Sequence, residues 1–232
     1  MPRSWPLSSA VILVASGCGL VSSEPPGIEL IVPDKAFTID ATSWQVDDAK
    51  AAEYLMTSCA DQPSVCSSAA AQACGTSCSG SCNADTDTCD LALDVSLYRP
   101  IDLVTEQPAL RSTDDQLQIT LDGVDYEVTA NTLSIATPAL EVFVAPSSVL
   151  EPGDPQARHL ATISPIETKQ ITAGPRPLLL TPEGTVALTA LMTDYDAPFN
   201  VIVGSQLWVR QNEPVPDGKI DAVIRIRARA GR

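Results

Sequence analysis

The chain has 232 residues, of which 29 are acidic, 14 are basic, seven are cysteine and one is histidine. This length allows a buried core, and a hydrophobic fraction of 44% with a mean hydropathy of +0.09 excludes wholesale disorder. A net charge of −15 argues against nucleic-acid binding, because phosphate contacts need a basic surface. A single histidine removes most metal sites and most Ser-His or Cys-His catalytic designs.

The first eighteen residues have the features of a targeting segment. Arg3 supplies a positive charge, and an apolar stretch follows at residues 7–15. That stretch is too short to span a bilayer, which needs about 20 residues. It ends in Ala15-Ser16-Gly17-Cys18, which resembles the lipobox of bacterial lipoprotein precursors, with small residues before a cysteine.

The lipobox resemblance implies cleavage after residue 17 and lipidation of Cys18, so that residues 1–17 form a signal peptide and residues 18–27 a lipidated tether. Gly19 follows the cysteine, where an aspartate would favour the inner membrane of a Gram-negative cell. The resemblance therefore implies an anchor in the outer membrane, facing the periplasm or the cell surface. The other interpretation is an ordinary secretory signal, with Cys18 in a disulfide.

The other six cysteines lie within 31 residues, at Cys59, Cys66, Cys74, Cys78, Cys82 and Cys89. An even, clustered set in an exported chain indicates three disulfides, whose pairing the sequence leaves open. A helix is expected to start at Gln62-Pro63 and to stop at Gly75. Cys66 and Cys74 would then lie about 12 Å apart along its axis, so we expect them not to pair with each other.

Residues 44–90 are predicted to form a disulfide-stapled, partly helical insertion. Apolar residues recur at helical spacing from Val46 to Cys59, where Ser43 or Asp47 provides an N-cap. A second helix would run through Ser64 to Cys74, and a cysteine-rich loop would continue to Cys89. Short alanine-rich helices are marginal alone, so disulfides have a structural reason to be there.

Two metal sites compete with this structural interpretation. The spacing Cys74-x3-Cys78-x3-Cys82 is compatible with an iron–sulfur cluster, although an oxidising compartment disfavours thiolates. Oxygen ligands at alternate positions, as in calcium loops, are offered by Asn83, Asp85, Asp87 and Asp90. Thr88 stands where such a loop needs glycine, so a solvated acidic turn is favoured and no cofactor is expected.

The remainder is predicted to form strands, because apolar and polar residues alternate. The expected strands are 91–98, 117–121, 124–128, 140–144, 160–163, 168–172, 200–210 and 220–228. Asp122-Gly123 is a hairpin signal, and a phase shift near Gly204 predicts a β-bulge. Residues 28–32 and 36–39 are expected to form an early strand pair that joins the same sheet. Residues 182–193, which also suit a strand, are expected to be helical. The spacing and the prolines predict an antiparallel β-sandwich over residues 28–232, immunoglobulin-like or similar.

Charge is uneven along the chain. Residues 1–130 hold 19 acidic and five basic side chains, whereas residues 131–232 hold ten and nine. Arg225, Arg227 and Arg229 share one face of the last predicted strand. They form either a stripe for an anionic partner or, as we favour, an outer face that pairs with acids of the same molecule.

Catalysis has little support in the sequence. His159 is interpreted as an ordinary surface or turn residue, and no known nucleophile or phosphate-binding motif is present. A carboxylate-based hydrolase stays an alternative, but no particular pair of acids can be named. Aromatic residues that could line a ligand surface are Trp44, Tyr98, Tyr126, Tyr195 and Trp208.

The sequence therefore predicts a non-catalytic envelope lipoprotein with a binding or structural role. Its partners would be the membrane, through the lipid anchor, and an envelope protein or polysaccharide. The alternative is a calcium-dependent or carbohydrate-binding surface module.

Overall fold

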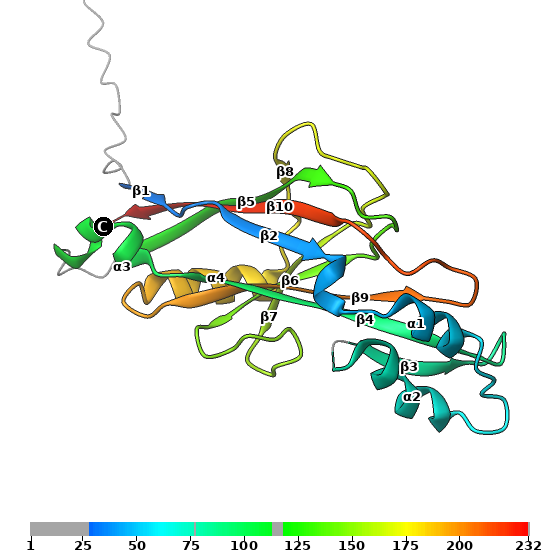
Figure 1. Ribbon diagram of the computed structural model, residues 1–232. Helices are drawn as coiled ribbons and strands as arrows, with labels where there is room; N and C mark the ends of the chain where they lie inside the picture. The colour runs from blue at the N-terminus through cyan, green and yellow to red at the C-terminus, as the bar shows by residue number, and fades with distance from the viewer. Residues whose placement is uncertain (1–27, 77, 113–117, 232) are drawn as a thin grey trace, which may run out of the picture.

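The structure, a computed structural model, describes residues 28–76, 78–112 and 118–231. The predicted signal peptide and tether, including Cys18, lie outside the described residues. Two antiparallel sheets, which we name A and B, dominate the described part and lie face to face (Figure 1). The prediction of a mainly β protein is therefore confirmed. No helix in the described ranges is both long and apolar enough to cross a bilayer.

Sheet A is built on the last strand, β10 (Lys219–Gly231). Strand β5 (Gln118–Asn131) pairs with β10, and the short β8 (Arg176–Pro177) pairs with β5. Strands β1 (Ile28–Ile31) and β2 (Lys35–Asp40) follow one another along the other edge of β10. The two early strands therefore join the sheet as predicted, but each pairs with β10 and not with the other.

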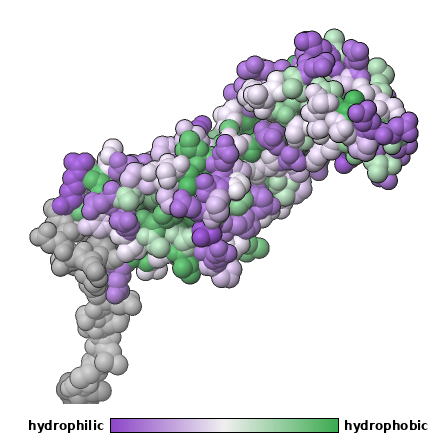
Figure 2. Space-filling view, turned by 90° about the horizontal axis from the view of Figure 1, so that it is seen from below, coloured by the Kyte–Doolittle hydropathy of each residue, from purple (hydrophilic) through white to green (hydrophobic). Residues whose placement is uncertain are grey.

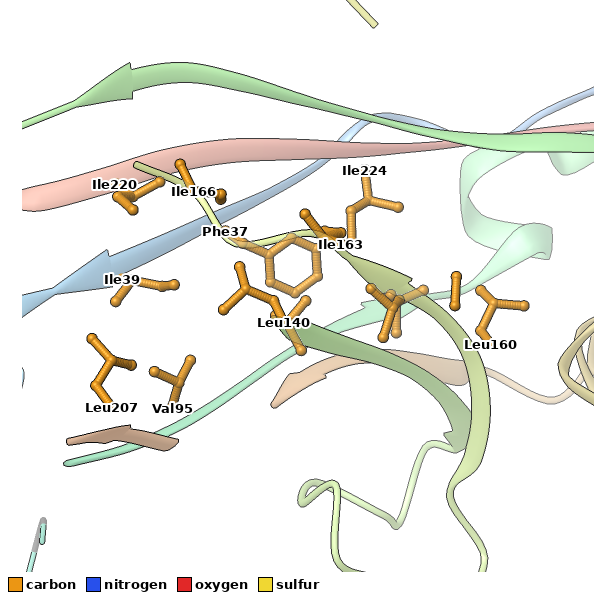
Figure 3. Packing of buried hydrophobic residues seen from close by; sticks show 14 of the residues in the cluster. Phe37, Ile39, Val95, Leu140, Leu160, Ile163, Ile166, Leu207, Ile220 and Ile224 are labelled. Atoms are coloured by element: carbon orange, nitrogen blue, oxygen red, sulfur yellow. The ribbon is translucent and has the colours of Figure 1, made fainter. Parts of the chain in front are cut away.

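Sheet B has the order β3 (Cys78–Asn83), β4 (Thr88–Ile101), β9 (Phe199–Val209), β6 (Leu140–Pro146) and β7 (Arg158–Ile163). The inner faces of the two sheets enclose the core (Figure 3). Phe37 and Ile224 of sheet A point toward Leu140 and Ile163 of sheet B. Alternation along the strands produces this core, because every second side chain faces inward.

Helix α4 (Pro182–Thr193) confirms the helical expectation for residues 182–193. Thr181 caps it by accepting a hydrogen bond from the Gly184 amide at 2.9 Å, and Pro182 occupies the first turn. The helix contacts β5, β6 and β7, where Leu188 and Met192 are fully buried. The short α3 (Leu103–Glu106) and the 3-10 helix η2 (Pro108–Ser112) follow β4.

A lobe at one end of the molecule contains all six clustered cysteines. We call residues 41–90 the disulfide lobe; it consists of the 3-10 helix η1 (Ala41–Trp44), α1 (Asp48–Leu55), α2 (Ser64–Cys74), β3 and the start of β4. Asp47 caps α1 and Gly75 ends α2, both as expected. The predicted cysteine-rich loop is instead the β3–β4 hairpin.

Three local predictions are wrong. Asp122-Gly123 is not a hairpin, because β5 runs through it and pairs with β10 on both sides; the register shifts there, as in a β-bulge. No bulge occurs at Gly204, where β9 pairs in unbroken register with β4 and β6. Residues 168–172 form no strand: residues 168–169 are a turn, with Lys169 at φ 61°, and residues 170–172 are irregular.

The break in the alternation of apolar and polar residues near Gly204 has a cause other than a bulge. Residues 199–204 are buried on both faces of the strand, because the loop after β6 covers the outer face there. Ile202 is fully buried in a small cluster with Val149 of that loop. A side chain at Gly204 would come within 2.7 Å of Pro152, so glycine permits the close approach of the loop.

Candidate functional site

The arginine row, Arg225, Arg227 and Arg229, lies on the outer face of β10, and each guanidinium contacts carboxylates of the same molecule. Arg225 donates to Glu127 at 2.6 Å and to Asp34 at 2.8 Å. The bulge in β5 lies where Asp122 reaches Arg229, with 2.7 Å between Nη2 and Oδ1.

Arg227 completes the row, with 2.8 Å between its Nε and Asp125 Oδ2. The hydrogen bonds to Glu127 and Asp34 raise the pKa of Arg225, and the bond to Asp125 raises that of Arg227. These contacts favour the interpretation of the row as an internally paired face over a stripe that awaits an anionic partner.

The acidic segment after β3 forms the turn of the β3–β4 hairpin. Asn83 Nδ2 donates to Asp90 Oδ2 at 3.0 Å, and Asn83 Oδ1 accepts from the Asp85 amide at 3.0 Å. Asp87 takes a left-handed conformation with φ 55°. The side chains of Asn83 and Asp90 thus hold the hairpin together, while Asp85 and Asp87 are exposed in the turn. Arg210 lies 3.7 Å from Asp90, which disfavours a cation there.

The six lobe cysteines form three disulfides, Cys59–Cys82, Cys66–Cys89 and Cys74–Cys78. Cys66 and Cys74 do not pair with each other, as expected from their spacing. The sulfur atoms of Cys59, Cys66 and Cys89 lie within 4.8 Å of one another, so two disulfides are neighbours in the lobe core. A cysteine in a disulfide offers no thiolate, so this pairing favours the structural interpretation over an iron–sulfur cluster.

The aromatic residues considered as ligand-binding candidates divide by exposure. Trp44 is buried, and its indole Nε1 donates to the Asp94 carbonyl at 2.8 Å. Tyr126 and Tyr195 are partly buried against the core. Tyr98 and Trp208, in contrast, are 41% and 40% exposed.

Tyr98 and Trp208 lie on one face of sheet B, its outer face. Trp208 is opposite Ala92 and Gln206 is opposite Asp94 in the register of β4 and β9. Residues that are directly opposite, or two apart on one strand, share a face. We call this surface the outer strip; it comprises Asp94, Ser96, Tyr98, Gln206 and Trp208, all exposed.

The only histidine belongs to a small polar group that the sequence did not reveal. His159 Nε2 lies 2.5 Å from Glu141 Oε2, and the Thr162 hydroxyl donates to the same oxygen at 2.8 Å. The register shift between β6 and β7 at Phe143 lies beside this group. No local motif signals it, because Glu141 and His159 meet through strand pairing.

This group lacks the geometry of a catalytic triad. In a triad, one imidazole nitrogen accepts the proton of the hydroxyl while the other donates to the carboxylate. Here the Nε2 atom of His159 faces both Glu141 and Thr162. A proton on Nε2 is needed for the bond to the carboxylate, so this nitrogen is not available to take one from Thr162.

Comparison with models of known protein families, with curated proteins and with solved structures gives no match for this chain.

Proposed function

We propose that the protein is a lipid-anchored, non-catalytic binding protein of the bacterial cell envelope. The proposal starts from the lipobox-like residues that end at Cys18, which imply that this cysteine is acylated. Gly19, in place of an aspartate, favours transport of the acylated protein to the outer membrane. Several acyl chains would make the attachment effectively permanent. The three disulfides suit an oxidising compartment and therefore agree with export.

The arrangement of the elements is the observation that supports display most directly. Strand β1, at the start of the described chain, and the C-terminal end lie at one end of the molecule, while α1, α2 and β3 lie at the other (Figure 1). Strands β4 and β9 connect the two ends. A tether before β1 would therefore hold the disulfide lobe away from the membrane, and leave the outer strip accessible between the two ends.

The finer architecture is part of this proposal. We infer that the two sheets form a sandwich of the kind found in immunoglobulin-like and similar domains, with the disulfide lobe inserted between β2 and the far part of β4. Such a rigid scaffold would position surface residues precisely enough for binding.

Metabolic labelling with radioactive palmitate tests the anchor. Cells that produce the wild-type protein are expected to yield a labelled band, and cells that produce Cys18→Ser are expected to yield none. A Cys59→Ser/Cys82→Ser variant serves as the matched control, since it also loses cysteines but keeps Cys18. Labelling that persists in the Cys18→Ser protein would overturn the proposal.

A further inference from the structure

The outer strip exposes aromatic surface that the fold itself does not use. Trp208 and Tyr98 are 40% and 41% exposed. Along β4, the position opposite Trp208 and the position of Tyr98 are about 20 Å apart. Exposed aromatic rings leave apolar area in water that a ligand can cover, and their flat faces favour stacking. The strip thus offers two stacking surfaces on one side of sheet B.

Polar groups with unused hydrogen-bonding capacity lie between the two rings. Gln206 Nε2 donates to Asp94 Oδ1 at 2.9 Å, which fixes the two side chains relative to each other. Among the described residues, no hydrogen bond involves Asp94 Oδ2, Gln206 Oε1 or the Ser96 hydroxyl. These oxygens can therefore accept hydrogen bonds from hydroxyl groups of a ligand.

The structure also holds the strip rigidly in place. The buried Trp44 donates a hydrogen bond from its Nε1 to the Asp94 carbonyl, and this bond fixes the backbone of β4 at the strip. On the other side, Pro152 lies against Gly204, so that the covering loop borders the strip beside Ser96, which is opposite Gly204. A preorganised surface loses less conformational entropy when it binds.

We propose that the outer strip binds a neutral polysaccharide, with sugar rings stacked on Trp208 and Tyr98 and hydroxyl groups bonded to Asp94 and Gln206. This inference rests on the proposed binding role and names its ligand. The strip carries one carboxylate, and the basic side chain that follows it along the chain, Arg210, lies 3.7 Å from Asp90, so the surface disfavours anionic polymers. Sugar hydroxyls can donate hydrogen bonds to Asp94 without burying an ion pair, which favours a sugar over a protein that would have to bury a cation against this carboxylate.

Affinity electrophoresis of the detergent-solubilised, full-length product tests this inference. Native gels would contain a soluble β-glucan, a mannan or a xylan as neutral probes, and alginate as the anionic probe. At least one neutral polysaccharide is expected to retard the wild type, and alginate is not. Trp208→Ala and Tyr98→Ala should each weaken binding about five- to tenfold. Leu179→Ala, which removes a side chain that is 93% exposed outside the strip, is the matched control and should bind normally.

Tryptophan fluorescence separates binding at the strip from binding elsewhere. The retarding polysaccharide is expected to shift the emission of the wild type to the blue, because Trp208 becomes covered while Trp44 is already buried. Trp208→Phe should keep most of the affinity and lose the shift. Thermal unfolding of each variant confirms that it is folded.

Three results would overturn the inference: no neutral polysaccharide retards the wild type, the Trp208→Ala/Tyr98→Ala variant binds like the wild type, or alginate binds as strongly as the neutral polymers. None of these results depends on Cys18. A failure of the palmitate test would therefore overturn the anchor and leave the polysaccharide site to be decided by the gels.

Discussion

At the residue scale, Gly80 of the disulfide lobe has no room for a side chain. A Cβ there would overlap the Tyr54 hydroxyl and would lie 2.6 Å from the Cys66 carbonyl oxygen. Gly80→Ala is expected to lower the free energy of unfolding by about 1–3 kcal/mol, as overpacking does. Urea denaturation measures this loss. Gly153→Ala is the control, because nothing lies within 4 Å of its Cβ; equal losses for both variants would contradict the account.

Tyr54 makes the lobe sensitive to alkaline pH. Burial, followed by the nearby Asp90, raises the pKa of Tyr54 from 10.0 to about 12. The folded state therefore keeps the phenol proton that the unfolded state releases above pH 10, so stability is full below that pH and falls as the pH approaches 12. Tyr54→Phe cannot ionise, and we expect its stability to fall less steeply between about pH 10 and about pH 12. Urea unfolding across that range measures both slopes, and identical slopes would refute this role of Tyr54.

Single residues were predictable only where their role is local. Asp47 and Gly75 were expected to bound helices because capping depends on neighbouring residues. The contact between His159 and Glu141 depends on how β6 and β7 pair, which no local pattern specifies. The outer strip was found only in part, since the sequence named Tyr98 and Trp208 but not the neighbours between them.

At the scale of elements, the three disulfides are expected to differ in their contribution to stability. Cys66–Cys89 joins residues 23 apart, whereas Cys74–Cys78 joins residues only four apart. Loop-closure entropy predicts about 3 kcal/mol for the longer loop and about 2 kcal/mol for the shorter. Removing Cys66 and Cys89 should therefore lower the unfolding midpoint more than removing Cys74 and Cys78. Calorimetry of the two paired alanine variants provides the test, and the reverse order would be inconsistent with it.

The arginine row on β10 gives a second prediction about how single elements contribute to stability. Arg225 is 27% exposed and bonds two carboxylates, while Arg229 is 60% exposed and contacts Asp122. Arg225→Ala should therefore lower the urea midpoint more than Arg229→Ala, and high salt should reduce the difference. Equal midpoints at low salt would show that the paired face does not depend on Arg225.

Elements were predictable where one physical pattern dominates. Alternation gave the positions of β4, β6 and β10, helical spacing indicated α1, and the boundary signals at Pro63 and Gly75 gave α2. The wrong predictions for these strands have tertiary causes. Pairing with β10 keeps Asp122-Gly123 in a continuous strand. The loop after β6, which contains Pro152, buries the outer face of β9 near Gly204 and so interrupts the alternation of apolar and polar residues. The pairing of cysteines also depends on which helix face meets β3 and β4.

At the scale of the whole molecule, the face seen in Figure 2 is more polar around the disulfide lobe and more apolar over the wider body. Together with the separation of β1 from the lobe, this shape fits a tethered protein with an exposed far end. The sequence could predict the sheets, but not that β1 and the disulfide lobe lie at opposite ends, because that depends on where β1 joins β10.

The residue after Cys18 should determine the membrane of residence. In a Gram-negative host, Gly19→Asp is expected to move the protein from the outer-membrane to the inner-membrane fraction of a density gradient. Gly19→Ser, which adds a side chain without charge, is the control and should stay in the outer membrane. An unchanged distribution of the aspartate variant would contradict the proposed address.

The central claim is that the protein is held in the envelope through Cys18. Intact-mass spectrometry of the protein extracted from membranes tests it most directly. The expected mass is that of residues 18–232 plus a thioether-linked diacylglyceryl group and an amide-linked acyl chain. A mass that corresponds to an unacylated chain, cleaved or uncleaved, would contradict the account.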